Sequence, residues 1–481
     1  MTGGVPIRKS GVAGRRNMRL AGGRAAFHDG DGMNIVIVGA GEVGSHLAEN
    51  LSAQAHNIYV VDKSAGLASE LNEKLDARVV CGAGSSVSAL EEAMIAEADL
   101  LLALTSDDSV NLVTCSVGKA LGARRALCRV HAGIQREEWL FNYREHFGID
   151  YLFSSERLAA VELAKFIRNP DSLLVEEIAR GRIELQQVVV DEGCDAIGRA
   201  LAGLGLPPRV RIGPVRRGGT QFLPGAGDAL QAGDRVTLFG EPRNLGGVAR
   251  MLQAKSPQPS AKNVVIFGGS ECGVALAQML ESGNDRVRVF ERDRQRCGRL
   301  AQLLQSTTII NADATSLPHL REEQVGEADF FVAVTDQDED NVMTCLQASN
   351  LGTGRTLALI HRADYADAIQ RSGAELGIMG AVSPREATRS DLMRFVTTRS
   401  TRTMLELDEG VELIEAGVPA DSPLDGMRVE DVEWPAASGL VALLHGQTAS
   451  VPAAGDEIGA GDTLYAIVGE SARREFAAMF D

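Results

Sequence analysis

The chain has 481 residues, too many for one ordinary hydrophobic core, and this length predicts roughly three or four domains of ~100 to 150 residues. Its 48 Lys and Arg against 65 Asp and Glu give a net charge of −17, which argues against a nucleic-acid-binding surface because phosphates require clustered cations. No apolar run approaches the ~20 residues of a membrane-spanning helix. Composition therefore predicts a soluble multidomain protein.

The N-terminal segment, residues 1–32, carries six Lys and Arg, two Asp and little apolar content. It lacks the apolar stretch of a secretory signal peptide. We expect either a disordered tail or an extension ahead of a true start at Met33.

The seven cysteines are scattered and form neither a CxxC pair nor a Cys/His spacing typical of zinc sites. This pattern predicts reduced cytoplasmic thiols that serve mainly as small core residues. They are Cys81, Cys115, Cys128, Cys194, Cys272, Cys297 and Cys345.

An apolar stretch that begins at Asn34, "NIVIVGAGEVGSHLAENL", turns on three glycines into a helical pattern. Gly39 and Gly41 allow a tight turn whose backbone N–H groups can approach a pyrophosphate, and Gly44 lets helix and strand pack closely. Asp62 ends the next apolar strand, where its carboxylate can accept both hydroxyls of an adenosine ribose. A 2′-phosphate would be repelled there, so the pattern favours NAD over NADP.

The next apolar strand, "DLLLALT", leads into the acidic loop "TSDDSVN". Thr105 and Asn111 in this loop could bond the nucleotide or a neighbouring subunit, although Asn111 could equally serve the loop itself. Asp107 and Asp108 are expected mainly to favour the positive end of the following helix. His131 ends a further strand, where a catalytic base could stand.

The whole pattern returns about 229 to 230 residues later. "VVIFGGSECG" at 264 repeats the glycine turn, Glu291 takes the place of Asp62, and "TDQDEDN" repeats the acidic loop with Asn341 in the place of Asn111. Asp338 and Asp340 repeat the acidic helix start, and His361 repeats His131. Ser270 replaces the middle glycine, so its Cβ is expected to crowd a pyrophosphate, which leaves nucleotide binding in the second half undecided.

A second kind of unit also repeats, as "FLPGAGDALQAGDRVTLFG" and "SVPAAGDEIGAGDTLYAIVG". Gly-Asp before an alternating strand predicts a turn in which Gly takes positive φ and Asp bonds its own backbone. Helical segments beginning at 154 and 383 are expected to link each large unit to its small one. In the second, Ser383 and Glu386 have capping-box spacing and Pro384 suits the first helical position.

We predict an α/β protein with two Rossmann-like, doubly wound parallel-sheet domains, each followed by a small α+β C-terminal domain. The expected domains span 33–170, 171–252, 263–398 and 399–481, with a Pro- and Ser-rich linker at 253–262.

The sequence offers nucleotide binding without a reaction centre. A hydride-transfer enzyme needs an acid/base and a substrate anchor beside the nucleotide, and the small units contain no recognisable base, nucleophile or metal cluster. We therefore expect a non-enzyme, with an NAD-dependent oxidoreductase or a redox sensor as the alternative.

The repeated order "VGAGEVG", "VVD", "ALTSDDSVN" and then the Gly-Asp unit resembles a regulator-of-potassium-conductance (RCK) domain. Two such domains in one chain resemble the regulatory subunits of Trk potassium uptake systems. The resemblance implies a cytoplasmic homotetramer whose ring of nucleotide-binding domains lies on the inner face of the cell membrane. It also implies a membrane-embedded potassium transporter of the TrkH/TrkG type as the partner, and NAD(H), ATP or ADP as ligands.

The family's nucleotide-binding positions carry over to both halves. Many such domains have an Asp after the third strand, which the second half keeps as Asp313 and the first replaces by Ala83. Glu42 and Glu271 inside the turns disfavour a bulky triphosphate. The predicted cofactor-binding residues are Gly39, Ala40, Gly41, Glu42, Val43, Gly44, Asp62, Thr105, Asn111, Gly268, Gly269, Ser270, Glu271, Cys272, Gly273, Glu291 and Asp313.

Overall fold

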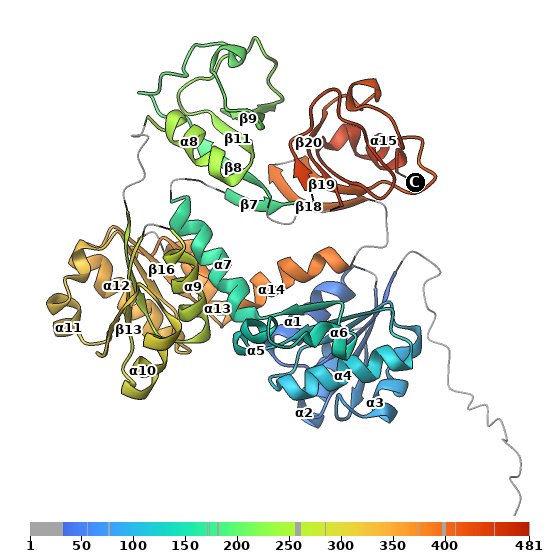
Figure 1. Cartoon of the computed structure of the whole chain (residues 1–481), viewed down its shortest axis with the longest axis vertical. Coiled ribbons are helices and arrows are strands. Elements are labelled where there is room, and N and C mark those ends of the chain that lie inside the picture. Colours follow the sequence, from blue (N-terminus) through green and yellow to red (C-terminus); the bar gives the residue numbers. More distant parts are fainter. Residues whose placement is uncertain are drawn as a thin grey trace, which may run out of the picture.

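The computed structural model contains two large α/β units and two small units (Figure 1). It describes residues 32–54, 56–75, 77–170, 172, 174–179, 182–254, 261–283, 285–373, 375–396, 401–408, 410–446 and 448–480. Residues 1–31 of the expected tail at 1–32, and residues 255–260 of the expected linker at 253–262, lie outside the described residues.

The first large unit is a six-stranded parallel sheet in the order β3-β2-β1-β4-β5-β6. Side chains alternate along β1, so Val36 and Val38 join one core and Ile35 and Ile37 join the core on the opposite face. The strands are β1 (Asn34–Val38), β2 (Asn57–Asp62), β3 (Arg78–Cys81), β4 (Leu100–Ala103), β5 (Arg125–Arg129) and β6 (Tyr151–Phe153). The helices are α1 (Glu42–Ser52), α2 (Ala65–Lys74), α3 (Val87–Glu92), η1 (Ile95–Glu97), α4 (Asp108–Leu121), α5 (Ala132–Glu137), α6 (Tyr143–Phe147) and α7 (Ser155–Arg168).

The second large unit repeats this topology, β14-β13-β12-β15-β16-β17, which confirms the predicted pair of doubly wound parallel sheets. Its strands are β12 (Asn263–Phe267), β13 (Arg286–Phe290), β14 (Thr308–Ile310), β15 (Phe330–Ala333), β16 (Arg355–Leu359) and β17 (Gly380–Val382). Its helices are α9 (Glu271–Glu281), α10 (Arg294–Leu303), α11 (Leu317–Glu322), η3 (Val325–Glu327), α12 (Asp338–Leu351), α13 (Ala363–Ser372), α14 (Pro384–Leu392) and η4 (Met393–Phe395).

The small units are also copies of each other, with antiparallel sheet orders β10-β9-β11-β8-β7 and β18-β19-β22-β20-β21. The first contains β7 (Leu174–Ile178), β8 (Ile183–Val189), η2 (Leu201–Gly203), β9 (Val210–Arg217), β10 (Thr220–Phe222), β11 (Arg235–Gly240) and α8 (Pro242–Leu252). The second contains β18 (Thr401–Asp408), β19 (Val411–Gly417), η5 (Val429–Asp431), β20 (Ser438–His445), β21 (Thr448–Ser450), β22 (Thr463–Gly469), η6 (Glu470–Ala472) and α15 (Arg473–Ala478). Phe239 and Leu185 of the first share one apolar core with Leu413 and Ile467 of the second, so the two sheets pack together.

The repeated Gly-Asp turns have the predicted chemistry. Gly233 and Gly461 take positive φ, +80° and +85°. The carboxylates of Asp234 and Asp462 accept the backbone N–H of the residue three positions earlier, each at 2.8 Å. These turns therefore set the entry into β11 and β22.

The two linking helices are exchanged between the large units. Helix α7 follows the first sheet, yet its Leu163 and Ile167 lie in the core of the second unit beside Val264. Helix α14 follows the second sheet, and its Leu392 lies in the core of the first unit beside Ile35. In Figure 1, α7 lies against α9 and α14 against α1. Each half therefore completes the core of the other.

The capping box predicted for α14 is wrong in its hydrogen bonds. Ser383 is the N-cap and Pro384 is the first helical residue, but the Ser383 hydroxyl makes no capping bond and is buried without a partner. Glu386 instead bonds Arg389 Nε at 2.9 Å and pairs with His46 Nε2 of α1 at 2.7 Å. The Glu386 carboxylate therefore bonds across the contact between the large units instead of capping its own helix.

Candidate functional site

A cavity of about 870 Å³ lies where the carboxyl ends of the first sheet face the second large unit. Its volume falls within the range of small-molecule sites, about 300–1,000 Å³. Both glycine turns and the first residues of α7 and α14 contribute to its wall. The sequence pointed to the first turn, whereas the participation of the second half in the same cavity was not predicted.

The first glycine turn packs closely on its strand and leaves free space over the start of α1. Gly39 has φ +106°, and a Cβ on Gly44 would lie 1.8 Å from the Gly39 carbonyl oxygen, which confirms the predicted close packing of helix on strand. A Cβ on Gly41, by contrast, would meet no protein atom within 4 Å. Protein packing therefore does not require glycine at 41, and the space over the start of α1 suits a phosphate group.

Asp62 lies at the end of β2 and borders the cavity. Its Oδ2 accepts the Ala40 N–H at 2.6 Å and its Oδ1 accepts the Ser64 N–H at 2.7 Å. Since a carboxylate has about four lone-pair sites, two remain for ribose hydroxyls. Asp62 therefore both orients the turn and presents an acceptor to the cavity.

In the second glycine turn, a side chain of the turn itself hydrogen-bonds the start of the following helix. The Ser270 hydroxyl donates to the Val334 carbonyl at 2.6 Å and accepts the Gly273 N–H at 3.2 Å, so it caps α9. It takes an N–H group of the helix start that would otherwise be available to a phosphate. The separate cavity at this turn measures only about 130 Å³.

Glu291, the counterpart of Asp62, is only 7% exposed. Its carboxylate accepts the Gly269 N–H at 3.2 Å and the Asp293 N–H at 2.7 Å, and Arg296 Nη1 lies 3.6 Å away. Asp313 borders the same small cavity, and hydrogen bonds from the Thr315 hydroxyl and N–H lower its pKa. Glu271 of this turn pairs with Arg136 of the first unit at 2.8 Å.

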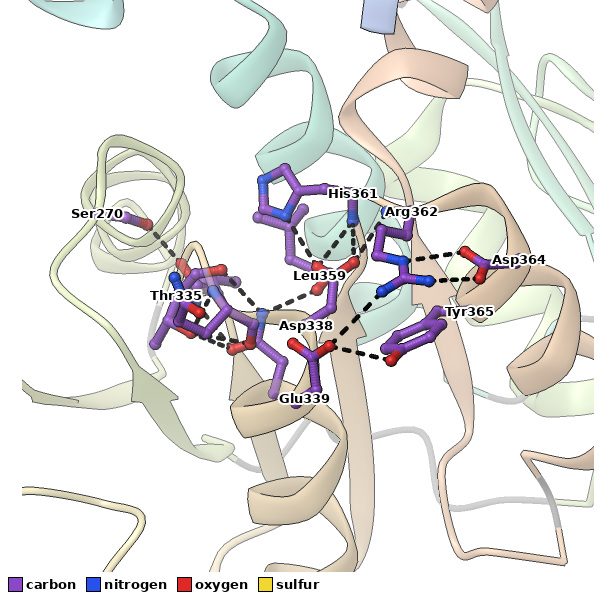
Figure 2. A network of polar contacts seen from close by, with 12 residues as sticks. Ser270, Thr335, Asp338, Glu339, Leu359, His361, Arg362, Asp364 and Tyr365 are labelled. Atoms are coloured by element: carbon purple, nitrogen blue, oxygen red, sulfur yellow. Dashed lines mark hydrogen bonds and ion pairs between the residues drawn. The ribbon is translucent and has the colours of Figure 1, made fainter.

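The buried asparagines position the acidic loops. Asn111 accepts the Thr105 hydroxyl at 2.6 Å and donates to the Thr105 and Arg129 carbonyls, each at 2.9 Å. Asn341 makes the same bonds with Thr335 and Leu359 (Figure 2). Both asparagines are fully buried, and neither lines the large cavity or the small one at the second turn. The geometry therefore favours a role for these asparagines in holding their own loops over a role in binding the nucleotide or a neighbouring subunit.

Each strand-ending histidine has an aspartate partner, which the sequence reasoning missed. His131 Nδ1 lies 2.9 Å from Asp108 Oδ1, and His361 Nδ1 lies 3.0 Å from Asp338 Oδ1 (Figure 2). The same aspartates accept the backbone N–H of these histidines. The acidic residues also lie at the helix starts as expected: Asp107 is the N-cap of α4 and accepts the Val110 N–H at 3.0 Å, and Asp108, Asp338 and Asp340 lie in the first turns of α4 and α12. In both repeats the histidine follows its aspartate by 23 residues, and this shared spacing could have indicated the pairing.

Replacement of Ser270 by glycine is expected to improve nucleotide binding in the second half. The change removes the hydroxyl that occupies the start of α9, and glycine is itself a tolerated N-cap that costs only a few tenths of a kcal/mol. Calorimetric titration of ADP should show an added or tighter binding event relative to the wild type. An unchanged isotherm would show that Ser270 does not limit this crevice.

The chain matches domain models of one family and is similar to several known proteins. The TrkA-N domain model matches residues 35–155 and 264–380, and the TrkA-C domain model matches residues 185–253. A Trk system potassium uptake protein TrkA homolog of Archaeoglobus fulgidus is 30% identical, with 87% of this chain and 93% of that protein covered. The Trk system potassium uptake protein TrkA of Haemophilus influenzae is 32% identical, with 86% and 91% covered.

Solved structures share the fold of most of the chain. The crystal structure of the GsuK RCK domain has a TM-score of 0.57 at 18% identity and covers 94% of this chain and 96% of that one. The GsuK channel bound to NAD has the same TM-score at 17% identity, with 94% and 79% covered. Within the ranges that the structure describes, no helix combines the length and apolar character needed to cross a membrane. With two TrkA-N matches, a TrkA-C match and relatives that are 30% identical or more over most of their length, the chain belongs to the TrkA family.

Proposed function

We propose that the chain is the nucleotide-sensing regulatory subunit of a Trk-type potassium uptake system. The observation that carries the proposal is the first glycine turn, where Gly41 leaves room for phosphates and Asp62 borders a cavity that both halves line. Residues Gly39 to Gly44 would hold the pyrophosphate of NAD(H), and Asp62 its ribose. In this role the nucleotide supplies binding free energy rather than hydride chemistry.

Because the linking helices are exchanged, nucleotide binding can change the relative position of the two large units. A ligand shifts a conformational equilibrium only by its differential affinity for the two states. Because the cavity is lined by both large units, its occupancy depends on their relative position. The nucleotide can therefore favour one arrangement of the two halves, with ATP or ADP as competing ligands.

The proposed partner is a membrane-embedded potassium transporter subunit of the TrkH/TrkG type. Relatives are named as TrkA proteins of Trk potassium uptake systems, and one protein of the same fold is a channel solved with NAD. We propose that four chains form a ring at the cytoplasmic face of this partner, without a nucleic-acid ligand.

An NAD-dependent oxidoreductase remains the second candidate, because the histidines of the two His–Asp pairs, His131 and His361, border the large cavity. A histidine oriented by a carboxylate is a common general base. Against this candidate, each Asp also holds the backbone of its histidine, which accounts for the pair by local structure.

One preparation tests the proposal. The tagged chain, expressed at native level and purified from detergent-solubilised membranes, should retain a potassium transporter subunit identifiable by mass spectrometry. Light scattering of the chain alone should give about four times 51.1 kDa, and bound NADH should keep its absorbance in the presence of small carbonyl compounds. A monomer without a membrane partner would refute the proposal, and sustained oxidation of NADH would favour the oxidoreductase.

A further inference from the structure

The two linking helices carry opposite charges at one equivalent position. Ser154 and Ser383 are the N-caps of α7 and α14, and the second helical residue is Glu156 in one and Arg385 in the other. Both side chains border the large cavity. The two halves thus carry side chains of opposite charge at the point where the linking helices meet the cavity.

The exchange of the helices brings the start of α14, with Arg385, to the wall of the cavity that the first glycine turn also lines. Its neighbour Glu386 pairs with His46, which is one helical turn after Glu42 at the start of α1. Leu392, further along α14, is buried in the core of the first unit. The second half of the chain therefore presents a cation to the crevice of the first half.

Glu156 lies at the corresponding place beside the second turn. The pKa of Cys272, the second residue of α9, is raised by burial and additionally by the charge of Glu156. The Glu156 carboxylate accepts Arg129 Nη2 at 3.0 Å and the Ser154 hydroxyl at 2.8 Å. Burial alone would raise the pKa of Glu156, but Arg129 and these hydrogen bonds outweigh it, and the pKa lies below its ordinary value. Glu156 is therefore anionic at neutral pH.

Arg385 is one of four Lys and Arg side chains that line the cavity. Its Nε is buried without a hydrogen-bond partner, and the carboxylate of adjacent Glu386 is already shared by His46 and Arg389. The other Lys and Arg side chains that line the cavity are Lys63, Arg129 and Arg296. Arg129 is paired with Glu156, Arg296 lies 3.6 Å from Glu291, and Lys63 adjoins Asp62 at the ribose end.

We infer that Arg385 binds the phosphate groups of a nucleotide held at the first glycine turn, whereas Glu156, at the equivalent place beside the second turn, offers no such donor. The inference rests on the proposed nucleotide binding and adds the residue that completes the site. A guanidinium offers several donors in a planar fork suited to phosphate oxygens. Because α14 belongs to the second half, the phosphate would link the two large units, which relates occupancy to their arrangement.

The test compares three ligands on the full-length protein by calorimetry. Arg385→Gln should weaken ADP and NADH binding about tenfold or more, because a charge-assisted hydrogen bond is lost. Binding of adenosine, which has no phosphate, should be unchanged. Arg389→Gln is the matched control, since Arg389 lies on the same helix and pairs with Glu386 in the described part of the chain. It should behave like the wild type.

Several outcomes would overturn the inference. Wild-type affinity for ADP in Arg385→Gln would remove the phosphate contact. An equal loss for adenosine, or an equal loss in Arg389→Gln, would show that Arg385 only supports the fold of α14. Wild-type protein that binds neither ADP nor NADH would refute the proposed function itself and the inference with it.

Discussion

Asp62→Ala is expected to lower NADH affinity at least about tenfold. Two charge-assisted hydrogen bonds to the ribose are lost, each worth about 1.5–3 kcal/mol, and water compensates only part of this loss. The substitution also removes Asp62 Oδ2, which accepts the Ala40 N–H at 2.6 Å. This hydrogen bond orients the glycine turn. Calorimetric titration of NADH and ADP measures both effects.

Glu291→Ala is the matched control, and it should change NADH affinity much less. Its carboxylate is buried and already engaged by the Gly269 and Asp293 N–H groups, in a crevice of about 130 Å³. Asp62→Asn separates the two roles of Asp62, because it keeps the shape and removes the charge. Equal losses for Asp62→Ala and Glu291→Ala would show that both halves bind NADH alike.

Leu163→Ala is expected to destabilise the second large unit, although Leu163 belongs to the first half of the sequence. Leu163 is fully buried on α7 beside Val264 and Ile266 of β12. Removal of such a side chain costs about 2–5 kcal/mol, from lost burial and the cavity that remains. Hydrogen exchange should therefore accelerate in β12 and β13, with β1 and β2 less affected.

The reciprocal variant, Leu392→Ala on α14, provides the control. Leu392 is fully buried in the core of the first unit beside Ile35 and Ile37, so protection should fall in β1 and β2 instead. Faster exchange confined to the sequence half that carries each substitution would contradict the exchange of the helices.

The nucleotide-binding units could be predicted from the sequence because their signals are local. Apolar strands, three glycines and an acid at the end of the next strand fall within about 30 residues, as in other βαβ units. The structure places these residues as expected, with Gly44 packed on Gly39 and Asp62 beside the turn. The Gly-Asp turns were equally predictable, since positive φ and an Asp–backbone bond involve only neighbouring residues.

Motifs that depend on a distant partner were not decided by the sequence. Ser383 and Glu386 have capping-box spacing, but His46 from the other large unit pairs with Glu386. Asn111 was equally compatible with a ligand or with its own loop, and only burial against Thr105 and Arg129 distinguishes these alternatives.

Two repeats of a Rossmann-like unit and a small unit, and their likeness to RCK domains, can be read from the residues in order along the chain. The exchange of α7 and α14, which brings Arg385 to the wall of the large cavity, is visible only in the folded chain. The physical reason is that an apolar helix face requires burial but does not specify the sheet that buries it. Two similar sheets offer similar surfaces, and the choice between them depends on contacts more than 100 residues apart, such as Leu163 with Val264.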